Sequence, residues 1–318
     1  HFCGMENRFE IHFAPIQGYT DWIYRNTFAC FFGGVDAYYT PFIRLEKGNA
    51  FRNRDMRDLD PKNNTVARLI PQILPGSPEE FRILAGKIRE MGYRQADINF
   101  FCSFFFLAHQ KKGAGILPYP ERVKTVLQTI DEFPDLDFSL KMRLGWESAG
   151  ECMDLLSVIN NLRLCWITVH ARTGKQQYKG TVDEEGFASF YRQCTRPLFY
   201  NGDLISVEQI QNIVAQYPLL RGVFVGRGLL SSPLLAADFQ GNETFSEKLR
   251  KKRFFDFHEA LFSAYESYFN DERLLLQKMK SVWDYFLPET DRKWLKRIRK
   301  AGRRDDYQIV IKELFRTN

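Results

Sequence analysis

Short hydrophobic runs alternate with helical patterns along most of the chain. Eight runs are rich in β-branched or aromatic residues and end in polar or Gly-containing turns, which predicts strands at 9–16, 34–43, 68–74, 96–102, 137–143, 164–171, 197–203 and 222–228. Apolar residues at helical spacing predict helices at 20–30, 77–91, 119–132, 149–161, 185–194, 206–216 and 229–239. Eight strands alternating with helices favour an α/β fold, the (β/α)8 TIM barrel.

A doubly wound open sheet is the rival architecture. It usually carries Gly-x-Gly-x-x-Gly after its first strand. Here the first predicted strand is followed by Pro15-Ile16-Gln17-Gly18-Tyr19-Thr20, and the pair Gly33-Gly34 leads into a strand. We therefore set the open sheet aside. The polar, charged segment 47–65 is expected to form a loop on one face of the barrel.

The pattern changes after Gln240. Helical spacing predicts helices at 245–269, 271–287, 291–301 and 305–316, with a weak strand signal only at 309–311. We therefore expect a barrel domain at 1–240 and an all-helical domain at 241–318. Residues 244–318 contain 18 Lys and Arg against 12 Asp and Glu, which accounts for the whole net charge of +6. This local excess suggests a polyanionic partner for the helical domain.

Composition narrows the class of protein. The 318 residues are 44% hydrophobic and 26% charged, as in ordinary globular proteins, and no uncharged apolar run is long enough for a membrane span. The first residues lack the layout of a signal peptide, so we expect a cytoplasmic protein without a membrane partner. The cysteines form no Cys-x-x-Cys pair and no His cluster accompanies them, so neither a metal site nor a disulfide framework is expected: Cys3, Cys30, Cys102, Cys152, Cys165 and Cys194.

Polar residues gather at the carboxyl ends of the predicted strands, where barrel enzymes build their sites. The densest stretch is 96–115, which places Asn99 and Cys102 at a strand end before a run of aromatics. The other ends contribute Pro15, Ile16, Gln17, Gln72, Lys141, Arg143, His170, Arg172, Asn201, Gly202, Asp203, Gly226, Arg227 and Gly228.

The last two strand ends and Lys141 suggest specific chemistry. Barrels commonly bind phosphate after strands seven and eight, and Asn201-Gly202-Asp203 and Gly226-Arg227-Gly228 offer backbone N–H groups and a cation there. Two tight turns are the alternative. A lysine pointing into the barrel mouth needs an anionic partner, for which a flavin edge is one candidate and a structural ion pair the other.

These strand ends together resemble the ordered motifs of the tRNA-dihydrouridine synthases. The resemblance covers the chain from Phe13 to about Phe239, and the basic helical tail also fits that family. It rests on Pro15-Ile16-Gln17-Gly18-Tyr19-Thr20-Asp21, Pro71-Gln72-Ile73, Asp97-Ile98-Asn99-x-x-Cys102, Lys141-Met142-Arg143-Leu144-Gly145-Trp146, Thr168-Val169-His170-Ala171-Arg172-Thr173, Tyr178-Lys179-Gly180, Asn201-Gly202-Asp203 and Val225-Gly226-Arg227-Gly228.

The resemblance implies an FMN-dependent barrel that reduces a uracil 5,6 double bond in tRNA, with NADPH as reductant, in a chain we expect to be monomeric. Hydride would reach C6, and Cys102 would protonate C5 as the general acid. Asn99 and Arg172 would contact the substrate. FMN contacts would fall on Pro15, Ile16, Gln17, Gln72, Lys141, His170, Asn201, Gly202, Asp203, Gly226 and Arg227.

The sequence departs from the family pattern around the cysteine. Phe101 and Ser103 replace the family's glycine and proline, and three further phenylalanines follow at 104–106. The rings either stack a flipped base or fill the uracil pocket and shift Cys102. The second outcome describes a homologue that binds FMN and tRNA with impaired turnover. A flavin oxidoreductase acting on a small molecule is a third reading, against which the basic tail argues.

The basic helix predicted at 291–301 yields a first test. Neutralising Lys293, Lys296, Arg297 and Lys300 together should weaken tRNA binding and flatten its salt dependence. A protein that contacts fewer phosphates releases fewer counterions from the tRNA when it binds. The measurement is the tRNA dissociation constant over a salt series. An unchanged slope would mean that this helix face is merely solvated.

Overall fold

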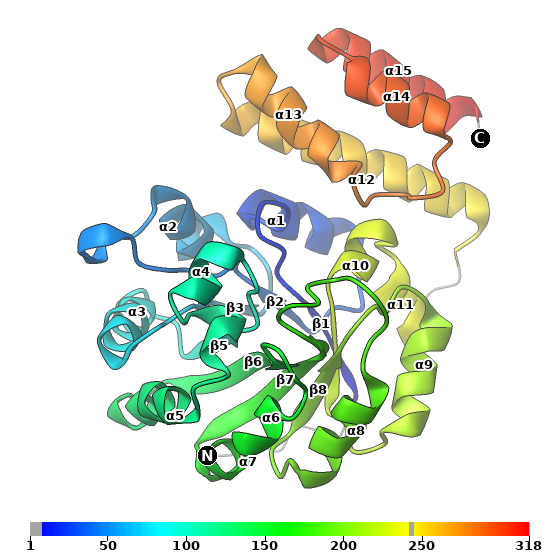
Figure 1. Cartoon of the computed structure of the whole chain (residues 1–318). Helices are drawn as coiled ribbons and strands as arrows, with labels where there is room; N and C mark the ends of the chain where they lie inside the picture. The colour runs from blue at the N-terminus through cyan, green and yellow to red at the C-terminus, as the bar shows by residue number, and fades with distance from the viewer. Residues whose placement is uncertain (1–7, 242–244, 318) are drawn as a thin grey trace.

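The strands form one parallel sheet that closes on itself. The computed structural model describes residues 8–241 and 245–317 (Figure 1). The sheet order is β3-β2-β1-β9-β8-β7-β6-β5-β4. The strands are β1 Glu10–Phe13, β2 Ala37–Tyr39, β3 Leu69–Ile70, β4 Gln72–Ile73, β5 Gln95–Phe100, β6 Asp137–Gly145, β7 Leu164–Thr173, β8 Leu198–Asn201 and β9 Gly222–Val225. The predicted barrel is confirmed.

The third predicted strand is divided into β3 and β4 at Pro71. Proline has no N–H to donate, so a regular ladder cannot continue through it. β3 pairs with β2 and β4 pairs with β5, while the carbonyl of Pro71 accepts the N–H of Asp97 at 2.8 Å. The first and last members of the sheet order are therefore two halves of one strand, and this strand completes the barrel.

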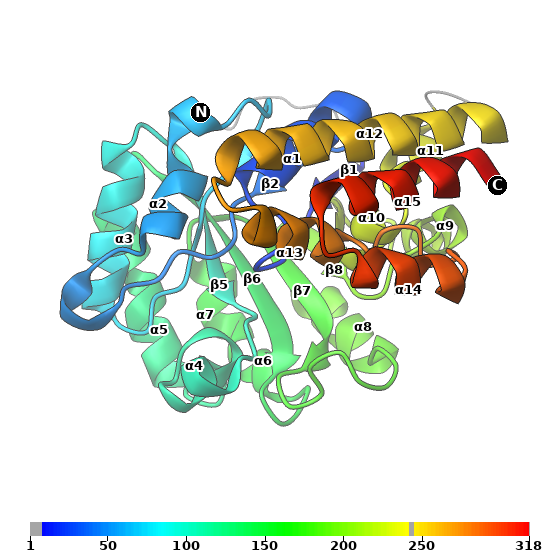
Figure 2. The ribbon, with the colours of Figure 1, turned by 90° about the horizontal axis from the view of Figure 1, so that it is seen from above.

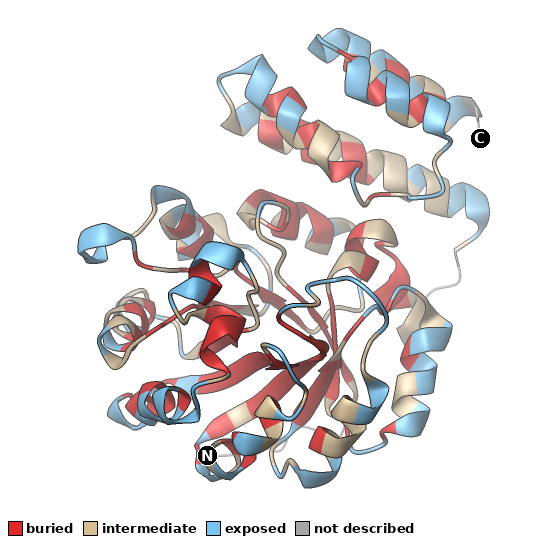
Figure 3. Cartoon of the chain, viewed as in Figure 1, coloured by how far each residue is buried: buried red, intermediate tan, exposed pale blue. Residues whose placement is uncertain are grey.

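Helices surround the barrel between successive strands, with their buried faces toward the sheet and their exposed faces outward (Figure 3). Ser77 caps α3, and Ser206 with Gln209 forms a capping box at α9, as the sequence indicates. Two predicted helices are each divided into two α-helices. The predicted helix 149–161 becomes α6 and α7, and the predicted helix 229–239 becomes α10 and α11, which are separated at Ser232-Pro233. The helices are α1 Trp22–Phe31, α2 Asn53–Leu59, α3 Pro78–Glu90, α4 Phe105–His109, α5 Pro120–Gln128, α6 Glu151–Asp154, α7 Leu156–Asn161, α8 Glu184–Gln193, α9 Val207–Gln216, α10 Arg227–Ser231 and α11 Leu235–Gln240.

Two local expectations are wrong. The segment 47–65 is not a loop throughout, because it contains α2 and the 3-10 turns Lys47–Asn49 and Pro61–Asn63. The weak strand signal at 309–311 belongs to the helix Arg304–Thr317, in which Val310 and Ile311 are buried and Ile309 is exposed. Cys3 and Thr244 lie outside the described residues.

Four C-terminal helices form a separate layer over the barrel, as Figures 1 and 2 show. They are α12 Glu247–Tyr268, α13 Glu272–Val282, α14 Arg292–Lys300 and α15 Arg304–Thr317. The expected boundary at 240–241 falls between α11 and α12. In the described part of the chain, no helix combines the length and apolar character needed to cross a membrane.

The helical layer is attached to the barrel through α1. The Phe257 ring on α12 packs 4.9 Å from that of Phe32, between ring centroids. Asp21, which caps α1, accepts a hydrogen bond from the Tyr265 hydroxyl at 2.7 Å. Its carboxylate also forms an ion pair with Lys278 at 2.8 Å. The loop after β1 is therefore held by the barrel and by the helical layer together.

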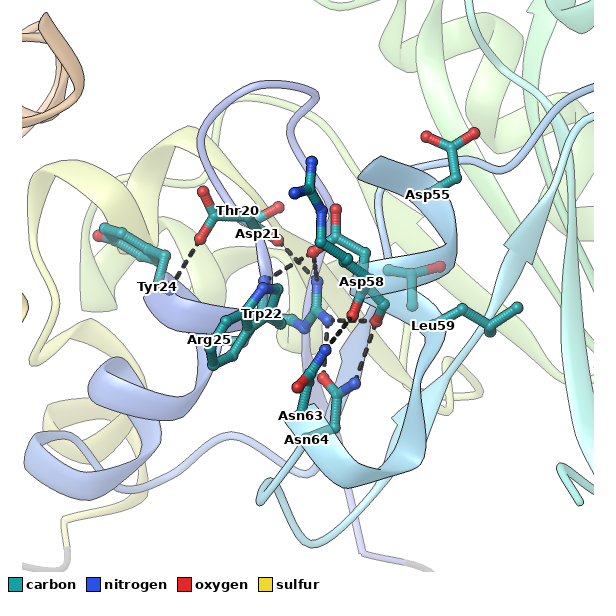
Figure 4. A network of polar contacts seen from close by, with 12 residues as sticks. Thr20, Asp21, Trp22, Tyr24, Arg25, Asp55, Asp58, Leu59, Asn63 and Asn64 are labelled. Atoms are coloured by element: carbon teal, nitrogen blue, oxygen red, sulfur yellow. Dashed lines mark hydrogen bonds and ion pairs between the residues drawn. The ribbon is translucent and has the colours of Figure 1, made fainter. Parts of the chain in front are cut away.

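A buried arginine joins α1 to α2 (Figure 4). The Arg25 guanidinium donates to the carbonyls of Thr20 at 2.8 Å and Asp58 at 3.0 Å, and to Asn64 Oδ1 at 2.8 Å. Its ion pair with the Asp58 carboxylate measures 3.6 Å. Burial raises the pKa of Asp58 to about 6, although Arg25 lowers it. This network gives the 47–65 segment its ordered form.

We expect Arg25→Met to destabilise the protein by about 3–5 kcal/mol at pH 8, because the substitution leaves a buried carboxylate unpaired. The loss should be smaller at pH 5. The raised pKa of Asp58 means that stability from its protonation is present at low pH and is lost as the pH rises through about 6.

The measurement for Arg25→Met is urea unfolding at both pH values, with exposed Lys62→Met as the control. The control should change the free energy of unfolding by less than about 0.5 kcal/mol. A loss below about 1 kcal/mol for Arg25→Met at both pH values would contradict the role of this network.

Candidate active site

The carboxyl ends of the strands surround two adjoining cavities. One, here called the phosphate-side cavity, has a volume of about 430 Å³ and lies at the ends of β8 and β9. The other, the thiol cavity, has a volume of about 350 Å³ and contains Cys102. All the predicted site residues line one or the other except Gly202 and Arg172. The barrel thus gathers residues from seven strand ends that are distant in sequence.

The loop that carries Cys102 is held by Asn99. The Asn99 side-chain oxygen accepts the backbone N–H of Phe101 at 3.0 Å and of Cys102 at 2.8 Å. Its amide nitrogen donates to the side-chain oxygen of Gln72 at 2.6 Å. Asn99 is therefore a positioning residue for the thiol loop.

The same hydrogen-bond chain extends into the barrel. Gln72 donates to the Asp97 carboxylate at 2.7 Å, and the Ser139 hydroxyl donates to Asp97 at 2.6 Å. Burial raises the pKa of Asp97 to about 6. The chain therefore links β4, β5 and β6 to the thiol loop, so the thiol takes its position from the rigid sheet.

Gly113 supports the thiol loop from the other side. Its φ of +58° is unfavourable for residues with a Cβ, and an added Cβ would lie 2.3 Å from the Cys102 carbonyl oxygen. The neighbouring Ala114 N–H donates to that carbonyl at 2.8 Å. The glycine-rich turn in the 96–115 stretch thus permits a close approach that a side chain would prevent.

The Cys102 thiol is held in its protonated form. Burial raises its pKa above the ordinary value, and Arg143 and Lys141 only partly oppose this effect. The thiol is therefore protonated at neutral pH, as a general acid must be.

Lys141 lines both cavities. It is 2% exposed, and its ammonium has no hydrogen-bond partner. Instead it lies 3.0 Å from the centroid of the Phe101 ring. Burial, and secondarily Arg143, lower its pKa well below the usual value. A buried amine in this state is ready for a hydrogen-bond acceptor or an anion.

His170 adds further unused hydrogen-bonding capacity. Neither of its ring nitrogens has a partner, and the Phe101 ring meets it edge-on at 5.3 Å between centroids. Burial lowers the pKa of His170 well below the usual value, so the imidazole is neutral. Because buried polar groups are nearly always satisfied, Lys141 and His170 together indicate a polar ligand in these cavities.

Two arginines fix the carboxylate at the end of β8. Arg227 donates to Asp203 at 2.6 Å, and Arg172 donates to its other oxygen. Burial alone would raise the pKa of Asp203, but these two bonds hold it below the ordinary value. Two cations around one carboxylate leave a net positive charge, which suits a phosphate.

Arg143 lines the thiol cavity, and its guanidinium is bonded to backbone carbonyls. Its guanidinium donates to the carbonyls of Phe101 at 2.9 Å, Thr173 at 2.9 Å and Gln177 at 2.8 Å. It therefore ties the thiol loop to the loop after β7. Arg172 is likewise buried against Asp203 and the Gly180 carbonyl, and lines neither cavity.

Two tyrosines line both cavities but are absent from the sequence-based set. Tyr178 lies beneath the Arg227 guanidinium, 4.3 Å from its ring centroid. Tyr285 comes from the helical layer. Tyr178 stands in a motif that the sequence does contain, whereas no local signal marks Tyr285.

Among the residues that the structure describes, no group of three or more His, Cys, Asp or Glu could hold a metal ion.

A closed parallel barrel with a protonated thiol and unsatisfied buried polar groups at its strand ends has the form of a barrel enzyme. The particular family follows from comparison with known proteins. The model of the dihydrouridine synthase (Dus) family matches residues 12–316, so this chain belongs to that family.

Curated relatives carry the same family name. The tRNA-dihydrouridine synthase B of Pasteurella multocida is 26% identical over 178 residues, which cover 56% of this chain and 52% of that protein. The tRNA-dihydrouridine(16) synthase of Pseudomonas syringae pv. tomato is 28% identical over 240 residues, 71% of this chain and 73% of that protein. The chain thus spans about half the length of the first relative and about three quarters of the second.

A solved structure supports the fold. The old yellow enzyme from Trypanosoma cruzi aligns with a TM-score of 0.51 at 9% identity, covering 77% of this chain and 91% of that one.

Proposed function

We propose that this protein reduces a uridine in tRNA to 5,6-dihydrouridine, with FMN as cofactor and NADPH as reductant. The observation that carries the proposal is the placement of a protonated thiol, Cys102, beside the unsatisfied Lys141 and His170 in adjoining cavities. Membership of the dihydrouridine synthase family supports the same reaction.

The residues of the two cavities fit FMN. Lys141 and His170 supply polar atoms without partners, Gln72 lies in the thiol cavity, and Arg227 offers a cation at the end of β9. Lys141 would face the edge of the ring that gains negative charge on reduction, and Arg227 would face the phosphate. The other proposed FMN contacts are Pro15, Ile16, Gln17, Asn201, Gly202, Asp203 and Gly226.

Reduction of the uracil double bond requires a hydride at C6 and a proton at C5. Reduced FMN supplies the hydride when it is bound. Cys102 donates its Sγ proton to C5, and the thiolate that remains regains a proton from solvent. The raised pKa of Cys102 keeps the proton in place until that step, while Asn99 fixes the loop. We assign contact with the base to Asn99, which lines the thiol cavity, and not to Arg172, which is buried against Asp203 and lines neither cavity.

The helical layer supplies the proposed tRNA-binding surface, residues 241–318. Lys293, Lys296 and Lys300 lie exposed on α14, whereas Arg297 pairs with Glu313 at 2.6 Å and so contributes less free charge. A groove between α12 and α15 is also basic. It is lined by Glu247 and by five cations, Lys248, Lys251, Lys252, Lys312 and Arg316, of which Lys252 pairs with Asp256. Phosphates attracted by these cations would bring the tRNA to the barrel mouth. We expect the protein to act as a cytoplasmic monomer.

The Phe101 ring favours a second candidate, an impaired homologue. The ring covers the Lys141 ammonium and lines both cavities, so it competes with any anion for that cation. Turnover therefore depends on whether the ring moves aside when FMN binds.

We expect Phe101→Ala to tighten FMN binding by about tenfold, because the cofactor must displace the ring from Lys141, and a desolvated cation–π contact contributes roughly 1–2 kcal/mol when the amine carries its proton. Phe101→Leu keeps most of the bulk and removes the aromatic face, so it separates steric from electrostatic competition. The measurement is quenching of FMN fluorescence during titration of the apoprotein. Weaker FMN binding by Phe101→Ala than by the wild type would show that the ring helps to hold the cofactor.

The reaction itself is tested by single-turnover oxidation of the reduced protein after addition of tRNA. We expect Cys102→Ala to slow this oxidation by about 10²–10⁴-fold, the usual contribution of a general acid. Cys30→Ala, at an exposed position on α1, is the matched control and should oxidise like the wild type. An unchanged rate in Cys102→Ala would overturn the acid role, and wild-type protein that forms no dihydrouridine would overturn the proposed reaction.

A further inference from the structure

Three consecutive phenylalanines expose their rings beside the thiol cavity. Phe104, Phe105 and Phe106 are 58%, 61% and 67% exposed, and no other phenylalanine in the described residues is classed as exposed. Exposure of neighbouring aromatic rings to water is unfavourable, and an exposed apolar patch often marks a binding site. Their place in the fold therefore calls for a partner.

The backbone beneath these rings is firmly held. Leu107 and Ala108 of α4 are buried, and an added Cβ at Gly115 would lie 2.4 Å from the Ala108 carbonyl oxygen. The short helix is therefore packed closely against the Gly113–Ile116 turn. The rings stand on a fixed support and do not need to be buried for the loop to fold.

Two of the rings line a third cavity of about 500 Å³, here called the aromatic cavity. It includes Phe104 and Phe106 but not Phe105, and it shares Gln17, Phe42, Cys102 and Phe104 with the thiol cavity. A chain molecule with one unit at Cys102 could therefore place the next unit against Phe104 and Phe106.

One part of the wall of the aromatic cavity is cationic. Arg44, Arg52 and Arg54 line it. They face two carboxylates: Arg44 pairs with Glu46 at 2.8 Å, and both Arg52 and Arg54 pair with Asp55, at 2.7 and 3.7 Å. The wall is thus left with one excess positive charge, and Arg54 is 57% exposed.

We propose that the aromatic cavity binds the nucleotide adjacent to the target uridine, with its base on Phe104 and Phe106 and its phosphate near Arg54. This inference rests on the proposed function, because it takes the uridine to lie at Cys102. Aromatic faces next to a cation are the usual platform for unpaired nucleotides. A uridine drawn out of its stack leaves its neighbour unstacked, and the two rings restore that stacking.

The first experiment compares Phe104→Ala/Phe106→Ala with Phe105→Ala, whose ring is equally exposed but lies outside the cavity. The probe is a short, fluorescently labelled single-stranded oligoribonucleotide containing one uridine, and the readout is its dissociation constant from anisotropy. We expect the double variant to bind about 10- to 100-fold more weakly. Phe105→Ala should stay within about twofold of the wild type. Far-UV circular dichroism checks that all the variants are folded.

The second experiment measures the salt dependence of the same binding in Arg54→Gln. Loss of one phosphate contact to a single strand should reduce the slope of log K against log salt concentration by about 0.7. An unchanged slope would remove Arg54 from the site and overturn the proposed phosphate contact.

Several results would overturn the base platform. One is that the double variant and Phe105→Ala bind the oligoribonucleotide with equal dissociation constants. Another is that the wild type does not bind it. Sedimentation gives another: a wild-type dimer that becomes monomeric in the double variant without a change in RNA affinity would identify a contact between two copies of the chain. Dihydrouridine formation is assayed separately in tRNA. Ring-dependent binding without dihydrouridine would support the platform while the proposed reaction fails.

Discussion

The site is organised around a buried amine with no hydrogen-bond partner. Taking an ammonium out of water costs several kcal/mol, and the Phe101 ring beneath Lys141 returns only part of that cost. Because burial disfavours the charged form, it lowers the pKa of Lys141. The surrounding barrel must therefore be stable enough to hold Lys141 in this state, and an acceptor that enters the cavity relieves the strain.

The closed sheet makes that possible. Pro71 interrupts the third strand, yet its two halves pair with different neighbours and complete the barrel. From that sheet, Asp97, Gln72 and Asn99 transmit a fixed position to the Cys102 loop through successive hydrogen bonds. Thiol, amine and imidazole thus occupy set places without any of them needing a direct bond to another.

The helical layer contributes to the same end of the molecule. Tyr265 and Lys278 bind Asp21 in the loop after β1, and Tyr285 lines both cavities. A surface proposed to bind tRNA is therefore physically continuous with the site of chemistry. This continuity would allow the basic tail and the polar strand ends of the barrel to act together in the proposed function.

The sequence by itself determined the barrel, the C-terminal helices and many of the polar residues that line the cavities, because strand ends in a parallel barrel converge on one face wherever polar residues follow apolar runs. The predicted helix ranges 77–91 and 206–216 also begin at the residues that cap these helices, Ser77 and Ser206, since capping is local. Only the tertiary structure decided that Phe101 covers Lys141, that Arg143 binds carbonyls, that Arg172 is taken up by Asp203 and that Tyr285 reaches the site. Those contacts join residues from different strands and layers, and no local pattern encodes which partner a buried side chain will meet. The helix α2 escaped prediction for the same reason: Arg25, distant in sequence, orders its polar segment.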